Sequence, residues 1–228
     1  MGAWPAWARR AIACCCLALA ALPAGAQQLR QGVDYRLIPQ QPVATGNKIE
    51  VIEFFWYGCP YCNELQPALE AWLKHKPADV EFRLIPAILH TNWAQHARIY
   101  YTLEALGELQ RLHSKVYYGY HVDKLYMSKP DVMEKWAVDN GIDRQKWLAA
   151  YNSPQVLQQV ADNSPQPAQQ GEKTRGLTAQ YDIDATPSLV VDGRYLTSGG
   201  MVNDLPDLIP ILDGLIKLAR EQRVANNK

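Results

Sequence analysis

Two cysteines with a Cys-x-x-Cys spacing are the residues best suited to chemistry in this chain. Cys59 and Cys62 follow a run of mostly apolar, β-branched or aromatic residues at 48–56, which is typical of a strand covered on both faces. Apolar side chains recur at helical spacing after Cys62, so the pair is predicted to begin a helix, with Pro60 in its first turn. Unpartnered N–H groups and the helix dipole would then favour the Cys59 thiolate, the form that attacks disulfides.

Closely spaced sulfurs can cycle between dithiol and disulfide with little movement of the backbone. Each unit by which the pKa of Cys59 falls favours the reduced form by about 1.4 kcal/mol. A more stable reduced form makes the disulfide a stronger oxidant. The position of Cys59 therefore predicts a pair that gives disulfides to other proteins.

A zinc site and an inert structural disulfide are the alternative interpretations of this motif. Structural zinc requires four ligands, and the sequence has no second cysteine pair downstream and no His-x3-His pair. We therefore expect neither a metal nor another cofactor. The structural disulfide stays open on the motif alone.

The N-terminus has the pattern of a secretory signal peptide. Two arginines precede an apolar run at 11–22, and Ala24-x-Ala26 follows as a cleavage site. The run is about half as long as a membrane span. Removal of residues 1–26 would take three cysteines away and leave only the Cys-x-x-Cys pair. We therefore expect export to the periplasm, where disulfides form.

The charge balance argues against a nucleic-acid partner. The chain has 23 basic and 23 acidic side chains, so no basic footprint for nucleic acid is present. No later apolar run is long enough to span a bilayer. The mature chain is long enough to bury a substantial core, either as one domain or as a domain with an insertion.

Two β regions are separated by a long helical stretch. The first reads strand, helix, strand, which predicts a parallel pair with a crossover connection. The pattern from 90 to 163 is helical throughout, with the Asp143 and Ser153-Pro154 signals opening two of its helices. The expected elements are an edge strand at 35–38, strands at 48–56 and 80–85, a helix from Cys62 to about 76, a further helix at about 168–181, strands at 188–191 and 194–197 joined by Asp192-Gly193, and a last helix from about 207.

Thr186-Pro187 begins the second β region and has two possible geometries. X-Pro is the only bond that commonly becomes cis. A cis bond would leave the backbone polar groups of Thr186 free to pair with an extended substrate peptide. A trans proline that begins an edge strand fits the pattern equally well.

Together these features resemble the DsbA family of exported thiol-disulfide oxidoreductases. The likeness lies in the signal peptide, in Phe54-Phe-Trp-Tyr-Gly-Cys59-Pro-Tyr-Cys62, in the helical interruption, and in Ala185-Thr-Pro187 with Val190-Val-Asp-Gly193. It implies an α/β, thioredoxin-like fold, in which a central mixed sheet is flanked by helices and carries an inserted all-helical domain. The implied boundaries are 27–89 and 166–228 for the two parts of the thioredoxin-like domain and 90–165 for the insertion.

The resemblance also assigns roles to the motif residues. Cys59 matches the exposed nucleophilic thiol, and Cys62 the buried resolving thiol. Pro60 and Tyr61 occupy the dipeptide that tunes the redox potential in the family. Many members have His where Tyr61 stands; a His⁺ would help to hold the thiolate and Tyr61 cannot, which leaves the strength of the oxidant open.

Three further positions match family residues. Pro187 corresponds to the cis proline that faces the disulfide, and Thr186 to the residue before it. Glu53 corresponds to a buried acid, whose pKa would be raised and which could accept the Cys62 proton through water. The alternative for Glu53 is a solvated carboxylate at the strand end. Arg83 is the candidate for its basic partner.

The function implied is that of a periplasmic oxidase. It would donate the Cys59–Cys62 disulfide to unfolded exported proteins with free cysteines, act as a monomer, and be reoxidised by a DsbB-type membrane quinone reductase. Trp56, Tyr57, Tyr61 and Trp93 are candidates for an apolar surface that receives unfolded chains, although the two tryptophans are also compatible with an ordinary core.

Two other functions remain as alternatives. A disulfide isomerase or reductase of the same fold is one, since Cys-Pro-Tyr-Cys is also the glutaredoxin signature. Exported isomerases usually carry an N-terminal dimerisation domain, and the stretch between Ala26 and the first core strand is too short for one. The signal peptide and the large insertion disfavour a glutaredoxin-like reductase. A non-catalytic periplasmic chaperone with a structural disulfide is the other alternative.

Overall fold

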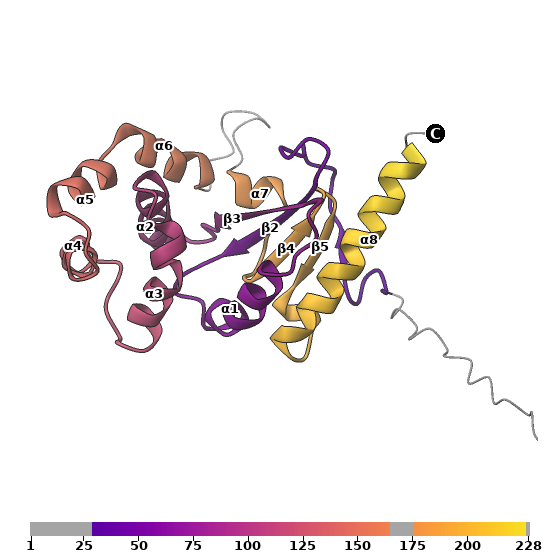
Figure 1. Ribbon diagram of the computed structural model, residues 1–228, viewed down its shortest axis with the longest axis horizontal. Coiled ribbons are helices and arrows are strands. Elements are labelled where there is room, and N and C mark those ends of the chain that lie inside the picture. The colour runs from indigo at the N-terminus through magenta and orange to yellow at the C-terminus, as the bar shows by residue number, and fades with distance from the viewer. Residues whose placement is uncertain (1–28, 165–175, 227–228) are drawn as a thin grey trace, which may run out of the picture.

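The computed structural model describes residues 29–164 and 176–226, in which a mixed β-sheet is covered by helices (Figure 1). The proposed signal peptide lies outside the described residues. The strands of this part of the chain form one sheet in the order β1-β5-β4-β2-β3. β2 pairs in parallel with β3 and antiparallel with β4, so the predicted mixed sheet is confirmed. The strands are β1 Arg36–Leu37, β2 Ile49–Phe55, β3 Val80–Pro86, β4 Ser188–Val191 and β5 Tyr195–Ser198.

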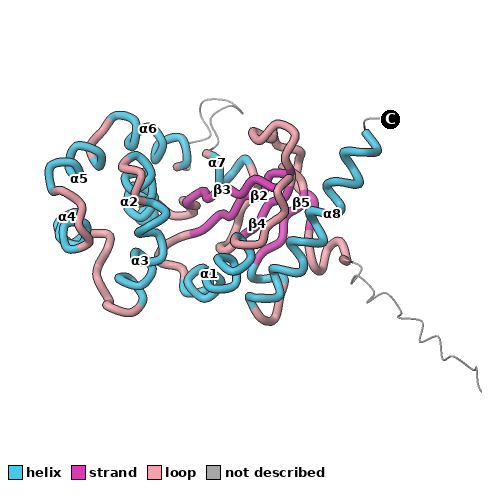
Figure 2. Tube along the Cα trace, in the orientation of Figure 1, coloured by secondary structure: helices cyan, strands magenta, loops and turns pink. Residues whose placement is uncertain are grey.

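β2 lies inside the sheet, between β4 and the edge strand β3, and all its side chains are buried. Because side chains alternate along a strand, Ile49 and Val51 pack on the face that also receives α1 (Pro60–Leu73) and α8 (Leu208–Asn226). Ile52 and Phe54 pack on the opposite face, with Tyr181 and Ile183. Figure 2 shows the strands enclosed by helices. A strand covered on both faces is what the mostly apolar run at 48–56 predicted.

The helical insertion lies between β3 and the short helix α7 (Leu177–Gln180). A single turn of 3-10 helix, Thr91–Trp93, leads into it. The side chains of Asp143 and Ser153 each accept a hydrogen bond from a backbone N–H three residues on, which caps two of the helices as predicted. The helices are α2 Ala94–Ala105, α3 Leu109–His121, α4 Pro130–Asp139, α5 Arg144–Tyr151 and α6 Pro154–Asn163.

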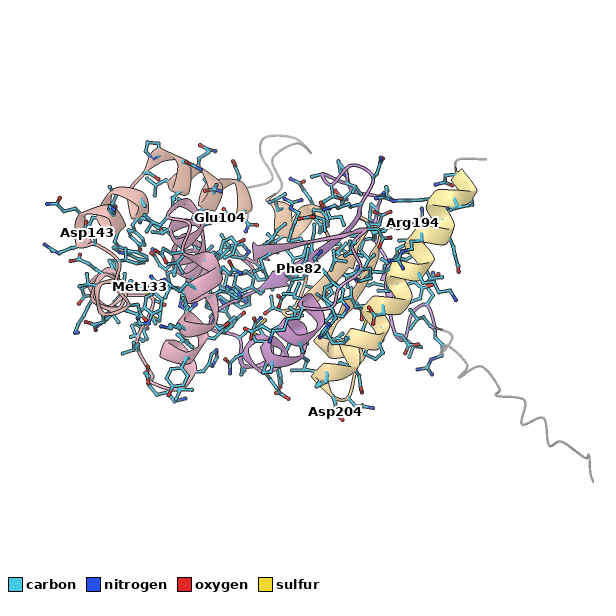
Figure 3. All side chains as sticks on the ribbon, viewed as in Figure 1. Phe82, Glu104, Met133, Asp143, Arg194 and Asp204 are labelled. Carbon is cyan, nitrogen blue, oxygen red and sulfur yellow. The ribbon has the colours of Figure 1, made fainter. Side chains whose placement is uncertain are left out.

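The insertion and the sheet share one hydrophobic core cluster. It contains Phe55 and Tyr57 at the end of β2 and both cysteines, together with buried residues of α2 to α6. Figure 3 shows how side chains fill the space between the sheet and the helices on its left. The dithiol therefore lies where the two parts of the molecule meet. The exact domain boundaries at 27, 90 and 166 stay predictions.

One expected helix differs from the structure. The pattern at 168–181 predicted a helix of about fourteen residues, but α7 covers only Leu177–Gln180. Gly176 is its N-cap, with an extended backbone. Residues 165–175, which include Pro165 and Pro167, lie outside the described part of the chain.

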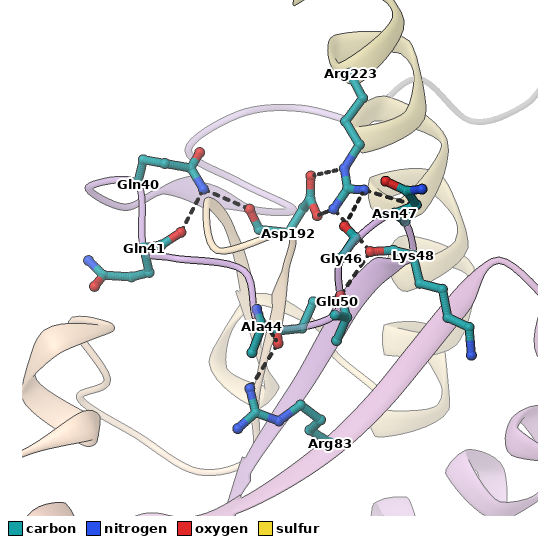
Figure 4. A network of polar contacts seen from close by, with 11 residues as sticks. Gln40, Gln41, Ala44, Gly46, Asn47, Lys48, Glu50, Arg83, Asp192 and Arg223 are labelled. Carbon is teal, nitrogen blue, oxygen red and sulfur yellow. Dashed lines mark hydrogen bonds and ion pairs between the residues drawn. The ribbon is translucent and has the colours of Figure 1, made fainter.

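The C-terminal helix is held to the sheet by Arg223. Asp192 and Gly193 both have positive φ, +53° and +66°, so the turn that their sequence predicted is present. Val191 pairs with Tyr195, so the connection has three residues and not the expected two. Asp192 accepts two hydrogen bonds from the Arg223 guanidinium, one of them at 2.9 Å (Figure 4). The same guanidinium donates to the carbonyl oxygens of Gly46, Asn47 and Lys48. No described helix is both long and apolar enough to cross a bilayer.

Candidate active site

Cys59 is the N-cap of α1, as the sequence predicted. Its backbone is extended, with φ −81° and ψ 117°, and its Sγ accepts a hydrogen bond from the Cys62 N–H at 3.4 Å. Pro60 follows as the first helical residue, where its missing N–H leaves nothing unpaired. Gly58 precedes the cap because a Cβ there would meet the Trp56 ring at 2.3 Å. The turn before Cys59 therefore requires glycine.

Both cysteines in the described part of the chain are free thiols, and both are buried. Cys62 is fully buried, as expected, but Cys59 is only 5% exposed. The expectation of an exposed nucleophile is therefore wrong for this conformation. The reason is the loop before β4, which approaches so closely that Cys59 Sγ lies 3.3 Å from the Thr186 carbonyl oxygen.

The two thiols differ strongly in acidity. A hydrogen bond from the Cys62 thiol lowers the pKa of Cys59 most. Contacts from Thr186 and from the backbone of Cys62 and Tyr61 lower this pKa further. Together they outweigh the burial of Cys59, which acts in the opposite direction, and the pKa of Cys59 falls to about 6. Burial raises the pKa of Cys62 well above its ordinary value, and its hydrogen bond to Cys59 acts in the same direction. At neutral pH the pair is therefore one thiolate and one thiol, which is the arrangement a nucleophile with a resolving partner requires.

The Thr186-Pro187 peptide bond is cis, which decides between the two geometries that the sequence left open. β4 begins directly after it at Ser188. The Thr186 carbonyl oxygen points to Cys59 rather than into the sheet ladder. The loop thus brings backbone polar groups to the reactive sulfur, although it lies more than a hundred residues further along the chain.

Glu53 is a buried acid, and the solvated alternative is wrong. It is 0% exposed, and neither carboxylate oxygen has a hydrogen-bond partner among the described residues. Burial, followed by the charge on Cys59, raises its pKa to about 8. Gln66 of α1 acts in the opposite direction, although its side-chain nitrogen has no hydrogen-bond partner among the described residues. Glu53 can therefore be neutral or charged near physiological pH.

Arg83 is not the partner of Glu53, contrary to the expectation. Its guanidinium pairs with Glu50 at 2.8 Å. Glu50 and Glu53 are three positions apart in one strand, so their side chains point to opposite faces of the sheet. Arg83 lies opposite Ile52 in the parallel register and reaches the Glu50 face. Glu53 has no cationic side chain paired with it in the described structure.

The aromatic residues near the motif divide into two groups. Trp56 and Trp93 are partly buried and stack on each other, with ring centroids 4.0 Å apart and planes 2° from parallel. Tyr57 is fully buried, whereas Tyr61 is 60% exposed. Of the four candidates for a receiving surface, Tyr61 is therefore the one that presents most of its side chain to solvent.

Sequence reasoning missed a group of buried polar residues beside the motif. Tyr57 was noticed only as a surface candidate, and His113 and Tyr117 of α3 were not singled out. Tyr57 and Tyr117 belong to the core cluster that contains both cysteines, and the His113 ring packs against both of them. At helical spacing these side chains look like ordinary core positions, and no motif would have marked them.

A thioredoxin-like fold with an acidic N-cap thiol, a buried partner thiol and a cis proline defines the class of thiol-disulfide oxidoreductases. No protein-family model matches the chain. Curated relatives do: the thiol:disulfide interchange protein DsbA of Bordetella bronchiseptica is 35% identical over 214 residues, covering 93% of this chain and 97% of the relative. The protein of the same name from Burkholderia cepacia is 31% identical, covering 85% and 87%. The chain belongs to the DsbA family of protein-disulfide oxidoreductases.

Solved structures agree with the sequence relatives. A crystal structure of Pseudomonas aeruginosa DsbA has a TM-score of 0.75 and 30% identity, and the match covers 88% of this chain and 97% of that one. DsbA from Xylella fastidiosa gives a TM-score of 0.70 at 28% identity, covering 82% and 96%. The predicted thioredoxin-like fold with a helical insertion is confirmed.

Proposed function

We propose that this protein works in the oxidising direction and donates a Cys59–Cys62 disulfide to newly exported proteins. A client thiolate attacks Cys59 Sγ, a mixed disulfide forms, and the electron pair of the broken S–S bond leaves on Cys62 Sγ. A second client thiolate then attacks the client sulfur of the mixed disulfide and expels Cys59 as a thiolate. The client gains one disulfide, and the protein is released with both cysteines reduced.

The observation that carries this direction is the state of Cys59 in the reduced protein. Its pKa of about 6, set mainly by the hydrogen bond from the Cys62 thiol, keeps it ionised at neutral pH. Stabilising the reduced form makes the disulfide more oxidising. A thiolate of low pKa is also a good leaving group, so the second step releases the client readily.

Glu53 is proposed as the proton donor and acceptor for Cys62. When the disulfide is broken, the Cys62 thiolate takes a proton from the neutral Glu53 carboxyl, because the pKa of Cys62 lies well above the pKa of Glu53, which burial raises to about 8. On reoxidation the proton returns to Glu53. A buried acid with this acidity suits general acid–base work near neutral pH.

The remaining site residues are proposed to bind or tune. The backbone of Thr186, before the cis Pro187, offers polar groups to an extended client segment beside Cys59. Tyr61 is exposed at the rim and is proposed to contact the client, while Pro60 and Tyr61 together tune the redox potential. Neither can supply the positive charge that a histidine would.

Export and reoxidation complete the proposal. The signal-like residues 1–26 would direct the chain to the periplasm, where exported proteins with free cysteines are its clients. A DsbB-type membrane quinone reductase would accept the two electrons and restore the disulfide. The protein would act as a monomer, without a metal or cofactor of its own.

Client oxidation by cysteine variants tests the proposed function. The oxidised protein should convert a reduced dithiol peptide to its disulfide, and Cys59→Ser should abolish this. Cys62→Ser, mixed with the disulfide form of the peptide, should trap a mixed disulfide through Cys59 and release the other peptide sulfur as a thiol. Insulin reduction, measured in parallel, separates an oxidase from a reductase. Peptide oxidation that persists undiminished in Cys59→Ser would exclude the mechanism.

A further inference from the structure

Polar groups that take no part in the steps above are buried between α3 and the end of β2. The Tyr57 hydroxyl is hydrogen-bonded to His113 Nδ1 at 2.9 Å. Tyr57 and Tyr117 are each 1% exposed and His113 is 9% exposed. The Tyr117 hydroxyl and His113 Nε2 have no hydrogen-bond partner among the described residues. Buried groups of this kind are rare because each costs free energy, so they call for an explanation.

The ring of Tyr117 is held rigidly by other aromatic rings. It meets Tyr57 edge-on with centroids 5.0 Å apart, and His113 edge-on at 5.4 Å. His121, one turn further along α3, stacks on it at 6.1 Å. Such pairs add to the packing energy. The hydroxyl is therefore fixed in direction, and little entropy is lost when it makes a hydrogen bond.

Tyr117 belongs to the core cluster that contains Cys59 and Cys62. Its helix packs on the cysteine-bearing helix α1, where Ser114 donates to Glu70. The charges of Cys62 and Glu53 act on Tyr117, and together with burial they raise its pKa well above the ordinary value. The hydroxyl therefore stays protonated and can only donate toward a nearby anion or accept from a nearby thiol.

We propose that the Tyr117 hydroxyl is a positioning donor for the proton exchange between Cys62 and Glu53, a role that rests on the proposed function. In the reduced resting state both neighbours are neutral, and the hydroxyl has no partner. When client attack breaks the Cys59–Cys62 bond, Cys62 becomes a thiolate and the hydroxyl donates to it until Glu53 delivers its proton. On reoxidation Cys62 gives the proton back to Glu53 and attacks the mixed disulfide, and the hydroxyl stabilises whichever group is charged.

Ionisable groups of several elements surround Tyr117. The charges that act on it come from Cys62 of α1, from Glu53 of β2, and from Tyr57 and Cys59 in the segment between these elements. His113 and His121 lie on its own helix. Burial lowers the pKa of His113 to about 4, so this imidazole is neutral at neutral pH and holds Tyr57 without carrying a charge. The groups whose charge changes during the reaction are therefore the two cysteines and Glu53.

Ring closure from a preformed mixed disulfide with glutathione isolates the step that needs the Cys62 thiolate. The rate should be followed from pH 5 to 10 in the wild type and in Tyr117→Phe. Loss of one donor to a charged group should slow closure about tenfold at pH 7 and move the midpoint of the rate profile up by about one pH unit. The melting temperature of the reduced variant should not fall, because the hydroxyl removed has no partner in that state.

Tyr100→Phe is the matched control. Tyr100 lies in the same cluster, and its hydroxyl donates to the Leu84 carbonyl oxygen at 3.1 Å, so this variant should lose stability and keep the wild-type profile. A Tyr117→Phe profile that coincides with the wild type would overturn the inference while leaving the proposed function intact. If Tyr117→Phe does not fold, 3-fluorotyrosine at position 117, a stronger donor, should speed closure and lower the midpoint; no change would be equally decisive. Peptide oxidation by Cys59→Ser would instead overturn the proposed function itself.

Discussion

At position 59, one sulfur combines burial with acidity, and the two effects oppose each other. Burial alone raises the pKa of a thiol, but hydrogen-bond donors at the start of α1 lower the pKa of Cys59 to about 6. Burial raises the pKa of Glu53 to about 8, and the charge on Cys59 acts in the same direction. The ionisation of Cys59 therefore influences the acidity of Glu53, so Cys59 cannot be substituted without affecting Glu53.

The acidity of Cys59 predicts that the stability gap between the two redox states depends on pH. A folded-state pKa below the unfolded value contributes stability that is complete above the unfolded pKa of 9.0 and is lost as pH falls through about 6. The oxidised protein has no such thiol. The free energy of unfolding of the reduced form minus that of the oxidised form should therefore increase between pH 6 and pH 9. Urea unfolding of both forms at intervals of one pH unit measures it.

Glu53 does not mask this trend. Burial raises its pKa to about 8 in the structure, so its contribution to stability falls as pH rises from its ordinary value of 4.5 toward 8. The burial that causes this shift acts in both redox states, and most of it cancels in the difference. Cys59→Ser, which cannot ionise in this range, should show a flat profile relative to the oxidised wild type. A flat profile for the wild type would contradict the assigned acidity.

At the scale of elements, the sequence predicted strands and caps well because their causes are local. Residues 48–56 are mostly apolar, β-branched or aromatic, and the motif that follows them supplies both the N-cap and the proline for α1. The helix predicted at 168–181 was wrong at Gly176, whose extended backbone begins α7 there. The partner of Arg83 was also wrong, because choosing between Glu50 and Glu53 requires the face of the strand and the register with β3.

The anchoring of α8 gives a prediction at the same scale. Arg223 bonds Asp192 twice and three backbone carbonyls besides, with its side chain 28% exposed and that of Asp192 14% exposed. Arg223→Ala should lower the free energy of unfolding by about 1–3 kcal/mol, because charge-assisted bonds in a partly buried site are lost. Urea denaturation of the reduced protein measures this loss.

Arg220 of the same helix is the control for Arg223. It also forms a two-fold pair with an aspartate, Asp79, at 2.7 Å for each bond, but both side chains are more exposed, at 40% and 52%. Exposed pairs contribute about 0–1 kcal/mol, so Arg220→Ala should cost less than Arg223→Ala. Equal losses in the two variants would show that burial and the loop carbonyls add nothing.

At the scale of the whole molecule, the sequence indicated a helical interruption of a thioredoxin-like fold but not how the two parts join. The interruption is visible as a change of hydrophobic period between 90 and 163. The contacts across the junction join residues far apart in the chain. Tyr57 meets His113 across the junction, and Cys59 meets Thr186 within the thioredoxin-like part. Because such pairings depend on the fold as a whole, no local pattern predicts them, and the buried hydroxyls and imidazoles at the junction read as ordinary core.

Asn163, where the insertion ends, is predicted to hold the junction together. It is 0% exposed. Its side-chain nitrogen donates to the Pro86 carbonyl oxygen at the end of β3 and to the Tyr101 hydroxyl of α2, and its oxygen accepts from the Thr178 hydroxyl of α7 at 3.2 Å. Asn163→Ala leaves buried acceptors and donors unpaired, and should cost about 2–4 kcal/mol. Asn152→Ala, an exposed asparagine at the end of α5 that bonds Leu148 and Arg98, should cost under about 1 kcal/mol. Chemical denaturation of both variants compares them directly, and a loss at Asn163 no greater than at Asn152 would mean that hydrophobic packing alone joins the insertion to the sheet.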